Sequence, residues 1–257
     1  MSSTTHAQKL SFSGRFKDKV AVVTGSSSGL GRALAVDLAH AGATVFALGR
    51  SADQLGPLEG EISTVAPGSK TIVCDVSDAT MLTGILTRIE RENSRIDILI
   101  NSTEAELEPA LDEIDLDGFR KALEVNLMAA VVGTCVVTPG MLERRSGIIT
   151  NILDSCAILP APGFGAYSSS KAALRAFSES ISFSLEPKGV KVHVVYPPWS
   201  KRKSQSEQVT ARRILNQIGK GRFEIFVSKS VRLVGIFKQL YPRTYHRIMQ
   251  DRAKASR

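Results

Sequence analysis

The chain has 257 residues, of which 43% are hydrophobic and 23% charged, a composition typical of an ordinary globular domain. We find no apolar run that approaches the roughly 20 residues of a membrane-spanning helix, and the three cysteines and four histidines are too scattered for a disulfide framework or a metal site. The net charge of +8 is uneven, because residues 201–257 hold 15 Lys/Arg and 3 Asp/Glu while the first 200 residues hold 18 and 22. We expect one α/β protein of the reducing cytoplasm.

Short β-branched apolar runs alternate with stretches of helical spacing along most of the chain. The predicted strands are 19–25, 44–49, 70–76, 96–101, 147–153 and 190–197. The predicted helices are 30–42, 52–65, 78–93, 115–140 and 165–186. This alternation predicts a parallel sheet with helices on both faces. We therefore expect a single doubly wound Rossmann domain over 18–198, a flexible leader over 1–17 and a helical appendage over 199–257.

A glycine cluster, "TGSSSGLG", follows the first predicted strand and leads into the first helix. Glycines at this junction let backbone N–H groups and the helix N-terminus approach a pyrophosphate closely. A plain strand–helix turn is the structural alternative, but three glycines in this frame make it a weak one. The predicted dinucleotide loop consists of Gly25, Ser26, Ser28, Gly29, Leu30 and Gly31.

The end of the second strand discriminates between the two nicotinamide dinucleotides. An acid there binds the ribose 2′-hydroxyl of NAD, whereas an arginine accommodates the 2′-phosphate of NADP. The sequence places Arg50 at this point, which favours NADP(H), and Ser26 could add a hydroxyl contact. Asp75 and Val76, after the third strand, suit the adenine. A helix-capping role for Asp75 or Asp78 is the structural alternative.

Tyr167 and Lys171 are four residues apart in a predicted helix and so share one face. A phenol normally loses its proton near pH 10. A nearby ammonium favours the phenolate and should lower the pKa of Tyr167, as proton transfer near neutrality requires. The same lysine could hold the ribose of a nicotinamide cofactor. The pair is therefore a candidate acid–base centre.

These motifs together resemble the short-chain dehydrogenase/reductase family over about residues 18–198. The resemblance is carried by "TGSSSGLG", "CDV", "VNL" and "YSSSK", and by "YPP" at 196–198, where the family has its Pro-Gly strand end. It implies that Tyr167 is the general acid, that Lys171 lowers its pKa and that Asn126 supports a proton-relay water. It also implies that Asn101 and Pro197 lie beside the cofactor. The implied reaction moves a hydride between a nicotinamide and a carbonyl carbon.

Three departures from the family pattern complicate this interpretation. The family serine that polarises the carbonyl falls on Asp154, with Ser155 one residue later. Either a one-residue shift turns Ser155 inward, or a protonated Asp154 acts as the donor. Glu104 stands where the family has a glycine. The family threonine after the sixth strand is absent, leaving Ser200 as a substitute and Thr210 as the next threonine.

We expect an NADP(H)-dependent carbonyl reductase or alcohol dehydrogenase acting on a lipophilic substrate. The "YPP" strand end is similar to that of reductases of 3-ketosphinganine and other long-chain ketones. The alternative is a catalytically silent NADP(H)-binding regulatory protein. The family resemblance also implies a homodimer or homotetramer built on the helices near 115–140 and 165–186.

The last part of the chain combines an apolar helical stripe with basic residues. Leu233, Ile236, Phe237, Leu240 and Tyr241 follow helical spacing up to Pro242, and the stripe resumes from Tyr245. The flanking bases are Arg232, Lys238, Arg243 and Arg247. We favour a helix that packs over the substrate cleft. The second interpretation is peripheral contact with an anionic membrane; nucleic-acid binding has no supporting motif.

Overall fold

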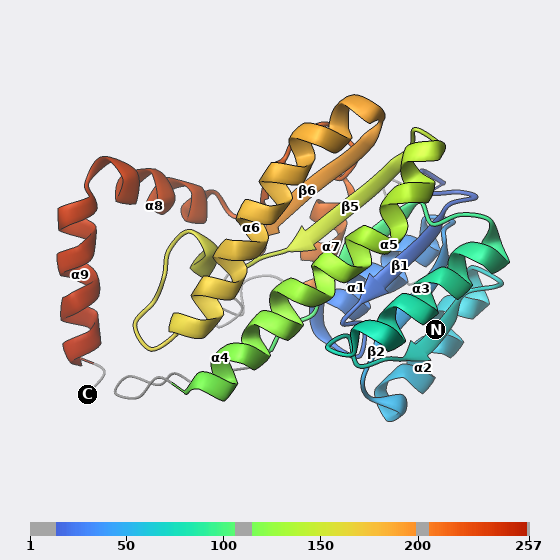
Figure 1. Cartoon of the computed structure of the whole chain (residues 1–257), viewed down its shortest axis with the longest axis horizontal. Helices are drawn as coiled ribbons and strands as arrows, with labels where there is room; N and C mark the ends of the chain where they lie inside the picture. Colours follow the sequence, from blue (N-terminus) through green and yellow to red (C-terminus); the bar gives the residue numbers. More distant parts are fainter. Residues whose placement is uncertain (1–13, 106–114, 199–205, 256–257) are drawn as a thin grey trace, which may run out of the picture.

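The computed structural model describes residues 14–105, 115–198 and 206–255. Seven parallel strands form one sheet in the order β3-β2-β1-β4-β5-β6-β7 (Figure 1). The strands are β1 Val20–Thr24, β2 Thr44–Gly49, β3 Lys70–Val73, β4 Ile98–Asn101, β5 Gly147–Ile152, β6 Val190–Tyr196 and β7 Glu224–Phe226. The chain reverses direction across the sheet after β3, and the carboxyl ends of β1 and β4 form the crevice where such folds bind ligands.

Helices cover both faces of the sheet, as the alternating pattern predicts. The helices α1, α2 and α7 share one apolar core, and α3 and α5 form the other with the end of α6. They are α1 Gly29–His40, α2 Ala52–Val65, α3 Ala79–Asn93, α4 Leu116–Leu123, α5 Ala129–Glu143, α6 Gly165–Leu185, α7 Glu207–Leu215, α8 Lys229–Leu240 and α9 Pro242–Ala255. Shorter turns are η1 Glu124–Met128, η2 Ser155–Ala157 and η3 Glu186–Lys188. The predicted doubly wound fold is confirmed.

The predicted domain boundaries are wrong at both ends of the Rossmann domain. Residues 1–13 of the predicted leader lie outside the described residues, but Phe16 is only 3% exposed and belongs to the α1 core. Arg15 also donates to the carbonyl of Leu215, 2.7 Å away. At the other end, α7 packs on α1 and β7 extends the sheet beside β6. The sheet and its covering helices therefore continue to Phe226, and only α8 and α9 project from them.

One continuous helical stretch, Leu116–Glu143, is long and apolar enough to cross a membrane by length and composition. The sequence expectation of no such run was wrong, because the polar residues near its middle are uncharged. The stretch packs against α3 and α6 and supplies Ala129, Val137 and Met141 to the core. Its apolar character therefore serves the interior of the domain.

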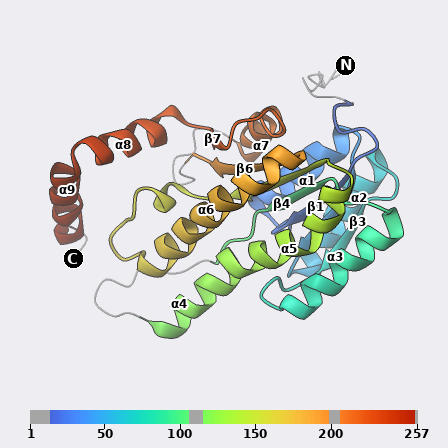
Figure 2. The ribbon, with the colours of Figure 1, turned by 45° about the horizontal axis from the view of Figure 1, so that its top comes forward.

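The helices α8 and α9 extend away from the sheet beyond β7 (Figures 1 and 2). We call them the C-terminal arm. Lys238 donates to the carbonyl of Ile158 over 2.7 Å, so α8 does touch the loop after η2. The predicted stripe is nevertheless largely open, since Leu233 is 65% and Leu240 67% exposed. The favoured packing of the whole stripe over a cleft is therefore not what the structure shows.

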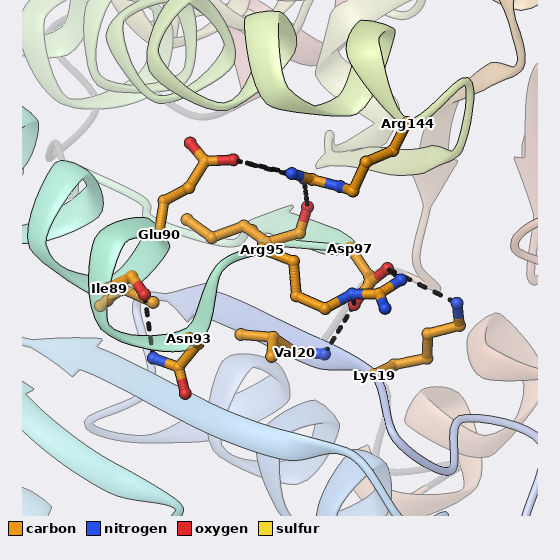
Figure 3. A network of polar contacts seen from close by, with 9 residues as sticks. Lys19, Val20, Ile89, Glu90, Asn93, Arg95, Asp97 and Arg144 are labelled. Carbon is orange, nitrogen blue, oxygen red and sulfur yellow. Dashed lines mark hydrogen bonds and ion pairs between the residues drawn. The ribbon is translucent and has the colours of Figure 1, made fainter.

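A buried carboxylate, that of Asp97, holds the amino ends of β1 and β4 together (Figure 3). Asp97 accepts from the backbone N–H of Val20 at 2.9 Å and from Arg95 Nε at 2.7 Å, and pairs with Lys19 at 3.5 Å. Its side chain is only 4% exposed. Burial alone would raise the pKa of Asp97, but the bonds from Arg95 and Val20 and the charge of Lys19 hold it below the usual value.

Replacing Asp97 by Asn should destabilise the fold by about 2–3 kcal/mol, because buried donors lose a charged acceptor. The lowered folded-state pKa means that the carboxylate stabilises the protein above about pH 4 and that this contribution is lost as the pH falls further. Urea unfolding of wild type and Asp97→Asn at several pH values checks both points. The control Asp117→Asn removes an exposed pair with Arg120 and should change stability by less than about 0.5 kcal/mol. A constant wild-type-to-variant difference down to acid pH would contradict the assignment.

Candidate active site

Tyr167 and Lys171 lie on one face of α6, as their spacing predicts. Both are buried, at 8% and 2% exposed, and the Lys171 ammonium lies 5.8 Å from the Tyr167 ring centroid. Lys171 Nζ donates to the carbonyl of Thr103 at 3.3 Å, just past β4, and to that of Ile152 at 3.2 Å, at the end of β5. The lysine is thus fixed at the carboxyl ends of the neighbouring strands β4 and β5. Burial lowers its pKa, against the opposing charges of Glu104 and Asp154.

The Tyr167 hydroxyl donates a hydrogen bond to the carboxylate of Glu104. Burial of the phenol, followed by the charges of Glu104 and Asp154, raises the pKa of Tyr167. The expectation that Lys171 would lower this pKa is wrong for this structure, because the carboxylates and the loss of hydration outweigh the ammonium. The phenol is therefore held in its protonated form.

Asp154 and Ser155 bond to each other. The Asp154 carboxylate caps the η2 turn by accepting from the backbone N–H of Cys156 at 2.8 Å and from the Ser155 hydroxyl at 3.0 Å. Asp154 thus acts as an acceptor. The hydroxyl of Ser155, a residue that is 2% exposed, donates its hydrogen bond to Asp154 and is not free to donate to a substrate. Neither of the two expected arrangements, Ser155 donating toward Tyr167 or a donating Asp154, is present among the described residues.

Asn126 lies in the π-helical turn η1, a distortion often found at functional sites. Its side-chain oxygen accepts from the backbone N–H of Ala105 at 2.9 Å, and its amide donates to Ser170 at 2.9 Å. Asn126 therefore ties the segment after β4 to α6. This contact places Glu104 next to Tyr167, a positioning role that the sequence did not suggest.

Asn101, predicted to lie beside the cofactor, joins a buried chain of amides at the ends of β4 and β5. It donates to Asn151 at 2.8 Å, which in turn donates to Ser178 of α6 at 2.8 Å. The side chain of Asn101 is thus committed to holding two strands and a helix in register. Pro197, also predicted for the cofactor, directly follows β6 and is partly buried.

The glycine loop has the shape that a dinucleotide requires. Gly25 has a φ of +70°, and a Cβ there would lie 2.6 Å from the Ser102 carbonyl oxygen. A Cβ on Gly31 would lie 2.2 Å from the Gly25 carbonyl oxygen. Gly29, with a φ of +59°, opens α1, and the N-cap residue Ser28 makes no side-chain cap bond within the described structure. The N–H groups of the first turn are therefore suited to a phosphate.

The hydroxyl in this loop that suits a ligand is that of Ser27, which the sequence analysis did not single out. Ser26 is fully buried and its hydroxyl donates to the Val23 carbonyl at 2.9 Å, so the expected contact from Ser26 is wrong. Ser27 Oγ is buried without a hydrogen-bond partner among the described residues. A Cβ on Gly49 would lie 2.2 Å from it, which puts Ser27 beside the end of β2. Leu30 packs on the α1 core.

Arg50 and Asp75 follow β2 and β3 at the same edge of the sheet, and both are exposed. Asp75 accepts two bonds from Ser77, which lower its pKa, with a smaller effect from the charge of Arg50. Asp78, not Asp75, caps α3 by accepting from Met81 N–H at 2.9 Å. Val76 is buried at 4% exposed. These positions fit an adenosine and its ribose phosphate at the end of β2.

A family model described as short chain dehydrogenase matches residues 19–212. The chain belongs to the short-chain dehydrogenase family.

Similar short-chain dehydrogenases include proteins from fungi and animals. A short chain dehydrogenase of Pseudocercospora fijiensis is 39% identical over 181 residues, covering 70% of this chain and 59% of that protein. The 3-dehydrosphinganine reductase of Danio rerio is 30% identical over 182 residues, covering 69% and 55%. The 3-ketodihydrosphingosine reductase of Mus musculus is 29% identical over 182 residues, with the same coverage. The matches thus span less than two thirds of the length of these relatives.

Two solved structures share the fold. A metagenomic short-chain oxidoreductase, solved in complex with NADP, is 26% identical with a TM-score of 0.74, covering 82% of this chain and 97% of that one. A short-chain dehydrogenase from Streptomyces avermitilis is 22% identical with a TM-score of 0.79, covering 93% and 98%, and it supports the fold alone.

In this short-chain dehydrogenase, the structure brings together Tyr167, Lys171, Asn126 and Glu104. The residue that the sequence analysis treated only as a departure, Glu104, is the one that contacts the Tyr167 hydroxyl. The sequence does show an acidic residue at Glu104 where the family has a glycine. It does not show that the side chain points toward Tyr167. Ser200 lies outside the described residues, and Thr210 is buried in α7 at 5% exposed.

Proposed function

We propose that this protein is an NADP(H)-dependent reductase that converts a lipophilic ketone to a secondary alcohol. In the reverse direction it would act as an alcohol dehydrogenase. The observation that carries the proposal is the buried Tyr167–Lys171 pair, fixed at the ends of β4 and β5 in a fold whose glycine loop suits a dinucleotide. The leading substrate is a long-chain ketone similar to 3-ketosphinganine.

The cofactor proposal depends on the glycine loop and Arg50. The N-terminus of α1, approached through Gly25, Gly29 and Gly31, would hold the pyrophosphate. Arg50 and the unpartnered hydroxyl of Ser27 would hold a ribose 2′-phosphate at the end of β2. The complex of the metagenomic relative with NADP supports the same choice. When bound, NADPH would supply a hydride to the carbonyl carbon.

Tyr167 would donate its proton to the carbonyl oxygen while the ketone is reduced. Its raised pKa keeps the phenol protonated at neutral pH, which disfavours the base needed for alcohol oxidation, but it also makes the phenol a weaker proton donor. Positive charge near the hydroxyl would therefore be needed to ease the proton transfer. Lys171, held by two backbone carbonyls, would fix the position of the phenol and stabilise the phenolate that remains. The exposed Glu104 connects this hydroxyl with solvent, from which the proton is restored.

The substrate proposal draws on the relatives and on the C-terminal arm. Two relatives are named as reductases of 3-dehydrosphinganine and of 3-ketodihydrosphingosine. A substrate with a long alkyl chain would be collected from a membrane, and the arm offers exposed apolar residues near the η2 loop, among them Leu233, Leu240 and Tyr241. These features together favour a lipophilic ketone.

The second candidate function is a silent NADP(H)-binding regulator. It is favoured by one observation: the hydroxyls of Tyr167 and Ser155 are both engaged by carboxylates of the protein, Glu104 and Asp154. Such a protein would bind the cofactor without turning over any ketone. Ketone-dependent NADPH oxidation by the wild-type protein distinguishes the two functions.

We further propose that the arm contacts an anionic membrane surface from the cytoplasm. Residues 229–255 carry seven Lys/Arg and one Asp/Glu. Their charge is complementary to acidic headgroups, and the exposed Leu233, Ile236, Leu240 and Ile248 could enter the interface. A homodimer or homotetramer through α5 and α6, where Met128 and Phe183 are 41% and 73% exposed, is a separate proposal.

Replacing Tyr167 by Phe should lower the rate of NADPH-dependent ketone reduction by about 10²- to 10⁴-fold, because the proton donor is lost. NADPH absorbance with a panel of long-chain ketones measures the rate, and fluorescence titration measures cofactor binding, which should be retained. Thr80→Val, which removes an exposed hydroxyl on α3, is the control. Wild type that binds NADPH but reduces no ketone would support the regulator instead.

Replacing Arg50 by Ala should weaken NADPH binding by about tenfold or more and leave NADH binding nearly unchanged, because only NADPH carries the 2′-phosphate. Parallel fluorescence titrations with both cofactors measure the effect. Arg88→Ala, on the exposed side of α3, controls for the loss of a surface charge. Equal losses for the two cofactors would show that Arg50 does not select between them.

The wild-type protein should sediment with vesicles rich in phosphatidylserine at low salt and not with phosphatidylcholine vesicles. The double variants Leu233→Ser/Leu240→Ser and Arg243→Glu/Arg247→Glu should each reduce binding, because one removes apolar area and the other charge. Val65→Ser, which changes an exposed apolar residue at the end of α2, is the control. Binding that survives both arm variants, or self-association through the arm in its place, would overturn the membrane proposal.

A further inference from the structure

The contact between Tyr167 and Glu104 is held in place by hydrogen bonds of the residues on either side of Glu104. The segment that carries Glu104 is held on both sides: the Thr103 carbonyl accepts from Lys171 at 3.3 Å, and the Ala105 N–H donates to Asn126 at 2.9 Å. The Thr103 hydroxyl also donates to the Val125 carbonyl at 3.3 Å. The carboxylate is thus positioned at the reacting hydroxyl by three contacts to α6 and η1.

The charge around the Tyr167 hydroxyl is negative on the open side of the site. Glu104 is exposed and bonds to the hydroxyl, while Asp154 of the η2 cap is close enough that its charge also acts on the phenol. Lys171, on the other side, is almost completely buried and donates to two backbone carbonyls. A molecule that approaches Tyr167 from solvent therefore meets carboxylates first.

A ketone can reach Tyr167 only by replacing Glu104 as the acceptor of its hydroxyl. A neutral ketone breaks this charge-assisted bond and offers the carboxylate no donor in return, so part of the binding free energy is spent on the exchange. A ketone with an ammonium group on the carbon next to the carbonyl does not have this cost. Its oxygen and nitrogen are neighbours, as the Tyr167 hydroxyl and the Glu104 carboxylate are, so it can accept from one and donate to the other.

We propose that Glu104, with Asp154 beside it, is a specificity-determining cation site that selects ketones bearing a protonated amine next to the carbonyl. This inference rests on the proposed reductase function and adds the charge of the substrate to it. The ammonium also brings a positive charge close to the phenol. It would offset the two carboxylates and ease the loss of the proton from Tyr167. The substrate thereby supplies part of the electrostatic assistance that the buried Lys171 does not give.

The test compares two long-chain ketones of equal length, one with an amine and one with a hydroxyl next to the carbonyl. NADPH oxidation is followed for wild type, Glu104→Gln and the control Glu92→Gln, which alters an exposed glutamate on α3. Wild type and the control should prefer the amino ketone by about tenfold or more in kcat/KM. Glu104→Gln should lose this preference mainly through a higher KM for the amino ketone, with the KM for the hydroxy ketone unchanged or lower. A structural role alone would affect both ketones alike.

Calorimetry with a long-chain 2-amino alcohol and its N-acetyl derivative, in the presence of NADP⁺, gives a readout that does not require turnover. Wild type should bind the amine more tightly, and Glu104→Gln should bind both equally. Equal kcat/KM values for the two ketones in wild type, or a preference that survives Glu104→Gln, would overturn the cation site while leaving the reductase intact. If neither ketone is reduced but the amine still binds through Glu104, the reductase function fails and the cation site stands.

Discussion

The hydrogen bond from the Tyr167 hydroxyl to Glu104 sets the chemical state of the whole site. It joins α6 to the end of β4, and Asn126 and Lys171 hold the same segment from η1 and α6. Burial of the phenol and the charges of Glu104 and Asp154 raise the pKa of Tyr167, so the phenol stays protonated and the open side of the site is negative. In the proposed function, the proton held on Tyr167 and the preference for a cationic substrate would both depend on this one contact.

The site combines a buried cation, Lys171, with an exposed anion, Glu104. Lys171 is fixed at the ends of β4 and β5, where it braces the site from within. Glu104 is exposed, and in the proposed function it would exchange partners as the substrate enters. The C-terminal arm lies beyond the η2 loop and bonds to it through Lys238. In the proposed function, its apolar and basic residues would bring a lipophilic molecule to the same side of the domain.

Much of the fold could be predicted from the sequence, because its signals are local. The 52–65 helix and the 44–49 strand were predicted at their observed bounds, since periodic apolar residues and a capping serine define them. The strand β7 has only three residues, and its stability comes from packing such as the stacking of Phe226 on Tyr196, 4.5 Å between centroids. Such a strand leaves no periodic pattern. The burial of Phe16 depends in the same way on contacts distant in sequence.

The sequence predicted which residues form the site, but not the directions in which their side chains point. Tyr167 and Lys171 follow from helix spacing alone. The pairing of Asp154 with Ser155, and the exchange of Ser26 for Ser27 as the available hydroxyl, depend on which way a turn directs adjacent side chains. The sequence pattern cannot give that direction, since adjacent loop residues of similar chemical type can point to opposite sides of the chain. For the same reason Glu104 appeared as a departure and not as a partner of Tyr167.

The most direct measurement is an experimental structure with NADP⁺ and a long-chain 2-amino alcohol bound. The account predicts that the alcohol oxygen lies within hydrogen-bond distance of the Tyr167 hydroxyl and that the ammonium bonds to the Glu104 carboxylate, so that the direct bond between the two side chains is broken. A complex in which Tyr167 remains bonded to Glu104, with the amine held elsewhere, would contradict it.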